Sequence, residues 1–87
     1  MAQRKELDEL KEIARLATYD ALKEFEPLST EWRENLTLGS GIDEDYGIFE
    51  LYVAAERPED AVVISSARVN RKTKAVEVTV SNLTRIS

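Results

Sequence analysis

The side chains of this sequence that could carry chemistry are carboxylates, tyrosines and a basic group near the C-terminus. The 87 residues include no Cys and no His. Thiol nucleophiles, thiolate metal ligands and imidazole general bases are therefore excluded, and so is the usual Ser-His-Asp triad. Acid–base or metal chemistry would have to use the carboxylates, and no cofactor or metal is predicted.

An acidic loop follows the glycine-rich stretch 39–41. Asp43, Glu44 and Asp45 precede Gly47, and carboxylates at alternating positions near a glycine are typical of calcium loops. Here Gly47 takes the place of the third ligand, and Glu50 is too near to be the distal bidentate ligand. A solvated acidic turn at the entry of a strand is the simpler interpretation.

Glu50 is the second candidate, because it is the only acidic residue inside an otherwise apolar strand pattern. With Tyr46 and Tyr52 on the same face it could line a small polar cleft, although acid–base work by a pair of carboxylates would need burial of one of them. This pattern supports an alternative function as a small-ligand-binding or enzymatic domain. The competing interpretation is an outward Glu on a solvated sheet face.

Charge is distributed unevenly along the chain. Residues 1–60 carry 7 basic and 16 acidic residues, whereas residues 61–87 carry 5 basic and 1 acidic, for a net charge of −5 overall. The basic hairpin end of Arg68, Arg71, Lys72 and Lys74 has no neighbouring aromatics to stack bases, and the acidic total argues against nucleic acid as a partner. The asymmetry indicates either internal complementarity, with an acidic helix near a basic strand region, or a dipolar molecule that steers a charged partner or self-associates.

The N-terminal region, residues 3–26, has the periodicity of one long amphipathic helix that ends before Pro27. Its apolar stripe consists of Leu7, Leu10, Ala14, Ala17, Ala21 and Phe25. Leu16 and Leu22 lie off this stripe. Either the buried face is wider than six residues, or the helix has a second neighbour. Ser29 or Thr30 could cap a short turn after the helix.

Four strands are predicted, at 34–39, 46–56, 61–70 and 75–81, from the alternation of apolar and polar residues. Pro58 suits a type I turn at 57–60, and Asn70 starts the last hairpin turn. Residues 82–87 are expected to fray. The hairpin registers conflict unless a β-bulge lies near 55–62, because a slip of one residue inverts every side chain.

The predicted fold class is α+β: a single domain, residues 1–87, with the long helix packed on a three- to four-stranded antiparallel meander in two layers. This order resembles the cystatin-like superfold, which includes the nuclear-transport-factor-like domains. Residues 67–78 are similar to a Val-Asp-x-x-Thr-Gly-x-Val hairpin of small bacterial domains of this shape, some of them toxin immunity proteins. Asn70 replaces the Asp and Lys74 the Gly, which would place Lys74 at a left-handed position. The Gln-x-Val-x-Gly loop of cystatins is missing, so protease inhibition does not carry over.

The sheet face opposite the helix is the predicted interaction surface. Five residues are expected to form an apolar patch there: Tyr46, Ile48, Tyr52, Val62 and Ile64. The leading hypothesis is a non-enzymatic domain that binds a protein partner, or a second copy of itself, through this patch. The charged N-terminal residues do not resemble a secretory signal, and no stretch is apolar and long enough to span a membrane. A cytoplasmic location is therefore predicted.

Overall fold

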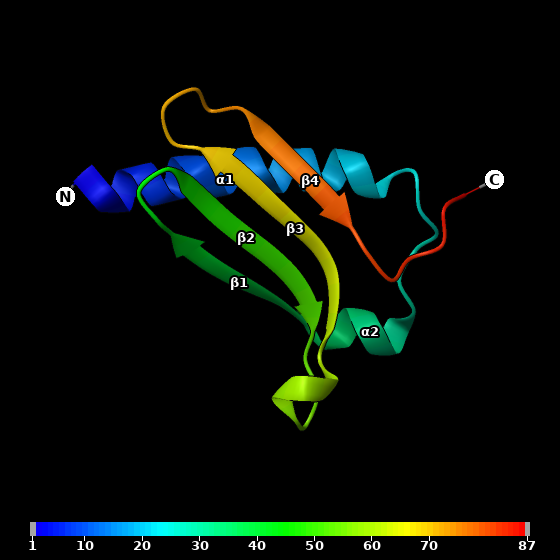
Figure 1. The fold of residues 1–87 in the computed structure, drawn as a ribbon. Coiled ribbons are helices and arrows are strands. Elements are labelled where there is room, and N and C mark those ends of the chain that lie inside the picture. Colours follow the sequence, from blue (N-terminus) through cyan, green and yellow to red (C-terminus); the bar gives the residue numbers. More distant parts are fainter. Residues whose placement is uncertain (1, 87) are drawn as a thin grey trace.

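The structure is a computed structural model that describes residues 2–86. Its elements are α1 (Ala2–Leu22), α2 (Thr30–Glu34), β1 (Leu36–Ile42), β2 (Tyr46–Val53), the short 3₁₀ helix η1 (Pro58–Asp60), β3 (Val62–Asn70) and β4 (Val76–Val80). The four strands form one antiparallel sheet in chain order, and α1 packs on one face of it, as Figure 1 shows. The predicted α+β meander is confirmed.

The core lies between α1 and the middle of the sheet. Leu10 and Ala14 of α1 are buried with Phe49 of β2 and with Ala67 and Val69 of β3. These are stripe positions of the helix and alternate positions of the strands, so both periodicities point at the same interface. Burying a leucine side chain completely contributes about 1.5–3 kcal/mol.

Gly47 of β2 lies directly beneath the helix. A Cβ placed there would be 2.9 Å from Cδ1 of Leu10 and 3.1 Å from Cε2 of Phe49. Only a residue without a side chain lets α1 approach this strand so closely. The helix position over the sheet therefore depends on one glycine.

The helix ends at Leu22, not at 26 as the periodicity predicts. The amides of Lys23, Glu24 and Phe25 donate to carbonyls three residues back, which tightens the last turn. The chain then pairs with its C-terminal segment: Phe25 forms a bridge with Arg85, and the amide of Glu26 donates to the carbonyl of Thr84 at 2.8 Å. The prediction of fraying is therefore wrong for the paired residues 84–86, and Ser87 lies outside the described residues.

The first strand is displaced from the predicted 34–39, because it includes Gly39 and Gly41, which resemble a loop in the sequence. Seven consecutive pairs with β2 hold β1 in place. The ring of Tyr52 covers Gly39, where a Cβ would be 3.4 Å from Cε1 of the tyrosine. Turn-forming residues are thus tolerated in a strand that lies at the sheet edge.

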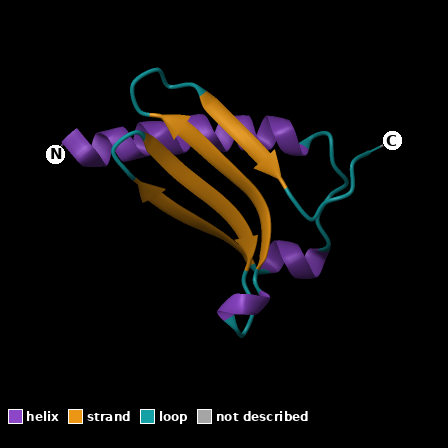
Figure 2. Ribbon diagram, viewed as in Figure 1, coloured by secondary structure: helices purple, strands orange, loops and turns teal. Residues whose placement is uncertain are grey.

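The predicted bulge exists, but it lies between Leu51 and Tyr52 of β2, opposite 63–65 of β3. Leu51 pairs with Ser65 and Tyr52 with Val63, so Ile64 is the extra residue. A bulge bends a strand. Figure 2 shows β2 and β3 curving away toward the η1 turn, and β2 ends at Val53 rather than at 56.

Local turn chemistry follows the sequence closely. Oγ of Ser29 accepts a hydrogen bond from the amide of Trp32 and caps α2, and Oδ1 of Asn70 accepts from the amides of Lys72 and Thr73. Lys74 has φ 66°, the left-handed conformation expected where the similar hairpins carry glycine.

Candidate functional site

Three of the five residues of the predicted patch share the open sheet face. Tyr46, Ile48 and Tyr52 alternate along β2 on the side away from α1 and are half-buried. Ile64 is completely buried, and Val62 pairs with Val53 on the helix side. The placement of Val62 and Ile64 on the open face is therefore wrong. The bulge lies three to four residues earlier on β2 than expected, so it turns Val63 to the open face instead.

The open face is also less apolar than its composition suggests. The guanidinium of Arg68 lies 4.3 Å from the centre of the Tyr46 ring, a cation–π contact that covers one face of the tyrosine. Glu50 is exposed between its cross-strand partners Gly39 and Ser66. The carboxylate and the tyrosines thus lie on a solvated surface, and the described residues do not form the predicted polar cleft around them.

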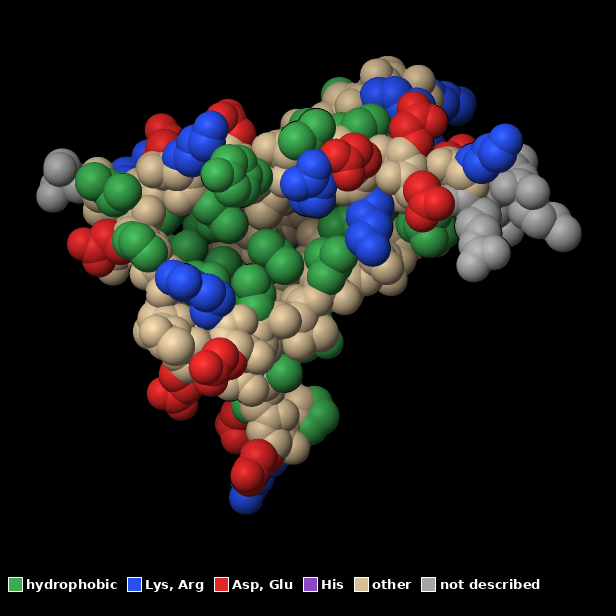
Figure 3. All heavy atoms as spheres, turned by 180° about the vertical axis from the view of Figure 1, so that it is seen from behind, with side chains coloured by type: hydrophobic (Ala, Val, Ile, Leu, Met, Phe, Trp, Pro, Cys, Tyr) green, Lys and Arg blue, Asp and Glu red, His purple; other side chains and the backbone are tan. Residues whose placement is uncertain are grey.

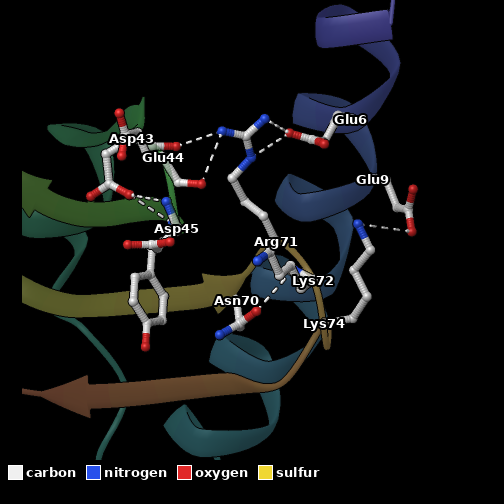
Figure 4. A network of polar contacts seen from close by, with 10 residues as sticks. Glu6, Glu9, Asp43, Glu44, Asp45, Asn70, Arg71, Lys72 and Lys74 are labelled. Atoms are coloured by element: carbon white, nitrogen blue, oxygen red, sulfur yellow. Dashed lines mark hydrogen bonds and ion pairs between the residues drawn. The ribbon is translucent and has the colours of Figure 1, made fainter.

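The acidic loop and the basic hairpin, which the sequence presents as separate candidates, meet at Arg71. Its Nε donates to Oε1 of Glu6 at 2.6 Å, and its Nη1 donates to the carbonyl of Asp43 at 2.7 Å. The amide of Arg71 donates to the carbonyl of Asp45 at 2.9 Å. Figure 4 shows the guanidinium between α1 and the β1–β2 turn. Arg71 therefore joins the helix, this turn and the last hairpin.

Asp43 organises the turn on the other side of Arg71. Its Oδ1 accepts hydrogen bonds from the amides of Tyr46 at 2.7 Å and Asp45 at 2.8 Å. These two bonds hold the pKa of the Asp43 carboxyl below its usual range, and the positive charges of Arg68 and Arg71 act in the same direction. This carboxylate is committed to the turn.

Internal charge complementarity is thereby confirmed. Besides the Arg71–Glu6 pair, Lys74 lies 3.7 Å from Glu9. Arg85 lies 3.6 Å from Glu24, so acidic residues of the helix region face basic residues of the last third of the chain. Within residues 2–86, no group of three or more carboxylates is arranged to hold a metal ion.

An uncovered apolar surface lies on the helix side of the sheet. A helix is about 10 Å across, whereas the outer strands of a four-stranded sheet are about 14 Å apart, so one helix leaves part of the sheet bare. α1 packs against β4, β3 and part of β2. Leu38 and Ile42 of β1, which point to the same side, remain 42% and 43% exposed.

A groove of about 200 Å³ lies between α1 and the part of the sheet formed by β1 and the second half of β2. Figure 3 shows hydrophobic side chains gathered in this hollow, with Lys and Arg side chains at its margin. The sheet contributes Leu38, Phe49 and Leu51, and the helix contributes Lys11, Ala14, Arg15, Thr18, Tyr19 and Leu22. The groove is therefore an apolar channel with polar and basic residues along its helical wall.

The helical wall carries positive charge. Arg15 pairs with Glu12, and the hydrogen bond from Arg15 lowers the pKa of the Glu12 carboxyl. Lys11 makes no ion pair within the described part of the chain. The ring of Tyr19, 66% exposed, has the ammonium of Lys23 5.3 Å from its centre. Among the described residues, Lys11 is thus the cation of this wall whose charge no carboxylate offsets, since Arg15 pairs with Glu12 and Lys23 with Asp20.

The sequence contains two signals of this groove. Leu22 lies off the apolar stripe of α1, and it lines the groove together with Leu38 of β1. Leu36 and Leu38 alternate on one side of the first strand. Neither signal locates the groove, because the lateral position of the helix on the sheet depends on tertiary packing.

Neither family models nor curated proteins match the sequence, and no solved structure matches the fold. The cystatin-like resemblance therefore stays a prediction. None of the helices within residues 2–86 combines the length and hydrophobicity needed to cross a membrane.

Proposed function

We propose that this protein is a non-enzymatic protein-binding domain that takes an amphipathic helix of its partner in the groove between α1 and β1. The observation that carries the proposal is the exposure of Leu38 and Tyr19, which line an apolar channel. Contiguous apolar surface of this kind on a small domain commonly marks an interface. The interaction class is the one predicted from the sequence, but the surface moves from the open sheet face to the helix side. The predicted cytoplasmic location stays part of the proposal.

Geometry favours a helix as the occupant. α1 covers about half of its side of the sheet, and a second helix lying beside it would cover β1 and the rest of β2. An amphipathic helix docks by residues at i, i+3, i+4 and i+7, which fit a straight apolar groove.

Charge favours an acidic helix. Lys11, which has no ion pair within the described residues, and Arg15, which pairs with Glu12, stand along the wall that would face the polar flank of the incoming helix. Glu or Asp residues beside its apolar stripe would meet these cations, which steers the encounter and sets the orientation more than it adds affinity. The expected partner segment is therefore an amphipathic helix with leucine-like anchors and an acidic flank.

The test uses two synthetic helical peptides with the same leucine spacing, one with Glu and one with Lys on the polar flank. Amide NMR shifts of the labelled protein should map the Glu peptide to Leu22, Leu38 and Leu51. Leu38→Glu should abolish these shifts. Val63→Glu is the matched control, because Val63 is 37% exposed on the opposite face.

Lys11→Glu should weaken binding of the Glu peptide and strengthen binding of the Lys peptide. Shifts centred on Tyr46, Ile48 and Tyr52 would overturn the groove assignment and return the interaction to the open face. Equal effects of Leu38→Glu and Val63→Glu, or no shifts with either peptide at millimolar concentration, would overturn it as well.

A further inference from the structure

The outer edge of β1 has the features of an unprotected sheet edge, to which a further strand could pair. β1 is the first strand in the sheet order, and Figure 1 shows no helix or strand alongside its outer margin. Natural proteins usually protect such edges with charges, prolines or bulges. Residues Leu36–Ile42 contain no charged residue and no Pro, and they pair with β2 without a register shift, although 33% of the chain is charged.

The free hydrogen-bonding groups of this edge can be assigned. The carbonyl of Asn35 accepts from the amide of Ala54, and the amide of Asp43 donates to the carbonyl of Tyr46, so Asn35 and Asp43 direct their backbone groups toward β2. This direction alternates along an antiparallel strand. The residues whose backbone groups point away from the sheet are therefore Leu36, Leu38, Ser40 and Ile42.

We propose that two copies of this chain associate through β1, antiparallel, with Gly39 opposite Gly39 of the second copy. This register places Leu36 opposite Ile42 and Leu38 opposite Ser40 of the other chain. Every outward amide and carbonyl of the four residues then has a partner, and the two sheets become one eight-stranded sheet. The association is independent of the groove proposal, because both grooves stay open on the helix side.

The register is self-complementary, and this favours a second copy over a strand of another protein. On the helix side Leu36 meets Ile42, and the exposed Leu38 gains apolar neighbours across the junction. On the open face Thr37 meets the bare backbone of Gly41, where a Cβ would have nothing within 4 Å. Leu36 thus meets another large side chain, whereas Leu38 and Thr37 each meet a small residue, so the strand fits against its own copy about a twofold axis.

Charge does not oppose this contact within the strand. The two Glu50 side chains lie on the second strands, about 14 Å apart across the junction, which exceeds the screening length of about 8 Å at physiological salt. Just beyond the strand ends, Glu34 comes opposite Glu44 of the second copy. This repulsion limits the pairing to seven residues, and added salt should strengthen the association.

The test is sedimentation velocity together with amide hydrogen exchange, each from micromolar to millimolar concentration. The mass should rise from one chain to two. Amides of Leu36, Leu38, Ser40 and Ile42 should become protected only at high concentration. Amides of Thr37, Gly39 and Gly41, which point toward β2, should be protected throughout.

Two variants at one position separate the backbone from the side chain. Ser40→Pro removes an outward N–H that makes no bond in the monomer and should raise the dimer dissociation constant at least about tenfold, because each dimer loses two hydrogen bonds. Ser40→Ala keeps the N–H and should leave the constant unchanged. Ser40 does not line the groove, so peptide binding by dilute Ser40→Pro protein reports separately on the groove and on correct folding.

A single-chain mass at millimolar concentration would overturn the proposal. So would a dimer in which the four outward amides exchange as fast as in dilute solution, since the contact would then lie on the groove or the open face. Equal dissociation constants for Ser40→Pro and Ser40→Ala would contradict the edge pairing in the same way.

Discussion

Both halves of the sheet direct apolar side chains toward the helix side, but α1 covers these side chains in only one half. In the β3–β4 half, Ala67 and Val69 are fully buried beneath α1. In the β1 half, Leu38 and Ile42 are each more than 40% exposed. Alternation decides which side chains of a strand point the same way, but it does not decide whether another element covers them. The uncovered half is where we place both proposed contacts.

The largest loss of stability is expected from truncating a buried side chain in the covered half. Leu10→Ala should lower the free energy of unfolding by about 3 kcal/mol, since it removes buried methyl groups and leaves a cavity. Leu38→Ala, in the uncovered half, should cost less than about 1 kcal/mol because its side chain is already partly in water. Urea denaturation measures both. Equal losses would mean that the two halves do not differ as described.

The next largest difference in stability is expected when a methyl group is added to a glycine in each half of the sheet. Gly47→Ala should destabilise the protein by about 1–3 kcal/mol, because the new methyl group would contact Leu10 and Phe49 at 3.1 Å or less. Gly41→Ala, at the free edge, should raise stability by less than about 1 kcal/mol by reducing the freedom of the unfolded chain. Thermal midpoints of the two variants should move in opposite directions.

Arg71 connects the helix of the covered half to the turn of the uncovered half. Arg71→Ala should cost about 1–2 kcal/mol, because it removes hydrogen bonds to Glu6 and to two loop carbonyls at a partly buried site. Lys72→Ala, the exposed neighbour, should change stability by no more than about 0.5 kcal/mol. A loss of stability for Lys72→Ala as large as that for Arg71→Ala would argue against a specific role of Arg71 in joining these elements.

The hairpin that closes the covered half contains a removable strain. Lys74 has φ 66°, so Lys74→Gly should stabilise the protein by about 0.5–1 kcal/mol even though the weak contact with Glu9 is lost. Lys74→Ala loses the same contact without relieving the backbone and should be slightly destabilising. If the glycine variant melts at or below the temperature of the alanine variant, the backbone of Lys74 is not strained.

The smallest expected effect is the pH dependence of the β1–β2 turn. The pKa of Asp43 is lowered in the folded state, so its stabilisation is fully present above the ordinary pKa of 3.8 and is lost as pH falls through the folded-state pKa. Asp43→Asn keeps an acceptor but not the charge. The parent should melt higher than the variant near pH 7, and the difference should shrink below about pH 4. A constant difference between pH 7 and pH 2 would contradict the assignment.

Much of the fold could be predicted because it depends on neighbours in the sequence. Local spacing and turn chemistry explain the helix stripe around Leu10 and Ala14, the valine alternation of β4 and the Ser29 cap. The left-handed Lys74 is what the resemblance to the glycine-containing hairpins implies. The candidate site could be predicted less well. Tyr46, Ile48 and Tyr52 were assigned to the correct face, but the bulge reversed the assignment of Val62 and Ile64.

The sequence by itself determined the α+β class, the order of the strands and the inward faces of β1, β2 and β4, since these follow from periods of 3.6 and 2 residues. Only the tertiary structure decided where α1 lies across the sheet, where Ile64 interrupts the register, and that the C-terminal segment ends the helix by pairing beside Phe25. These features depend on contacts between residues far apart in the chain, such as Leu10 over Gly47, whose energies no local pattern records.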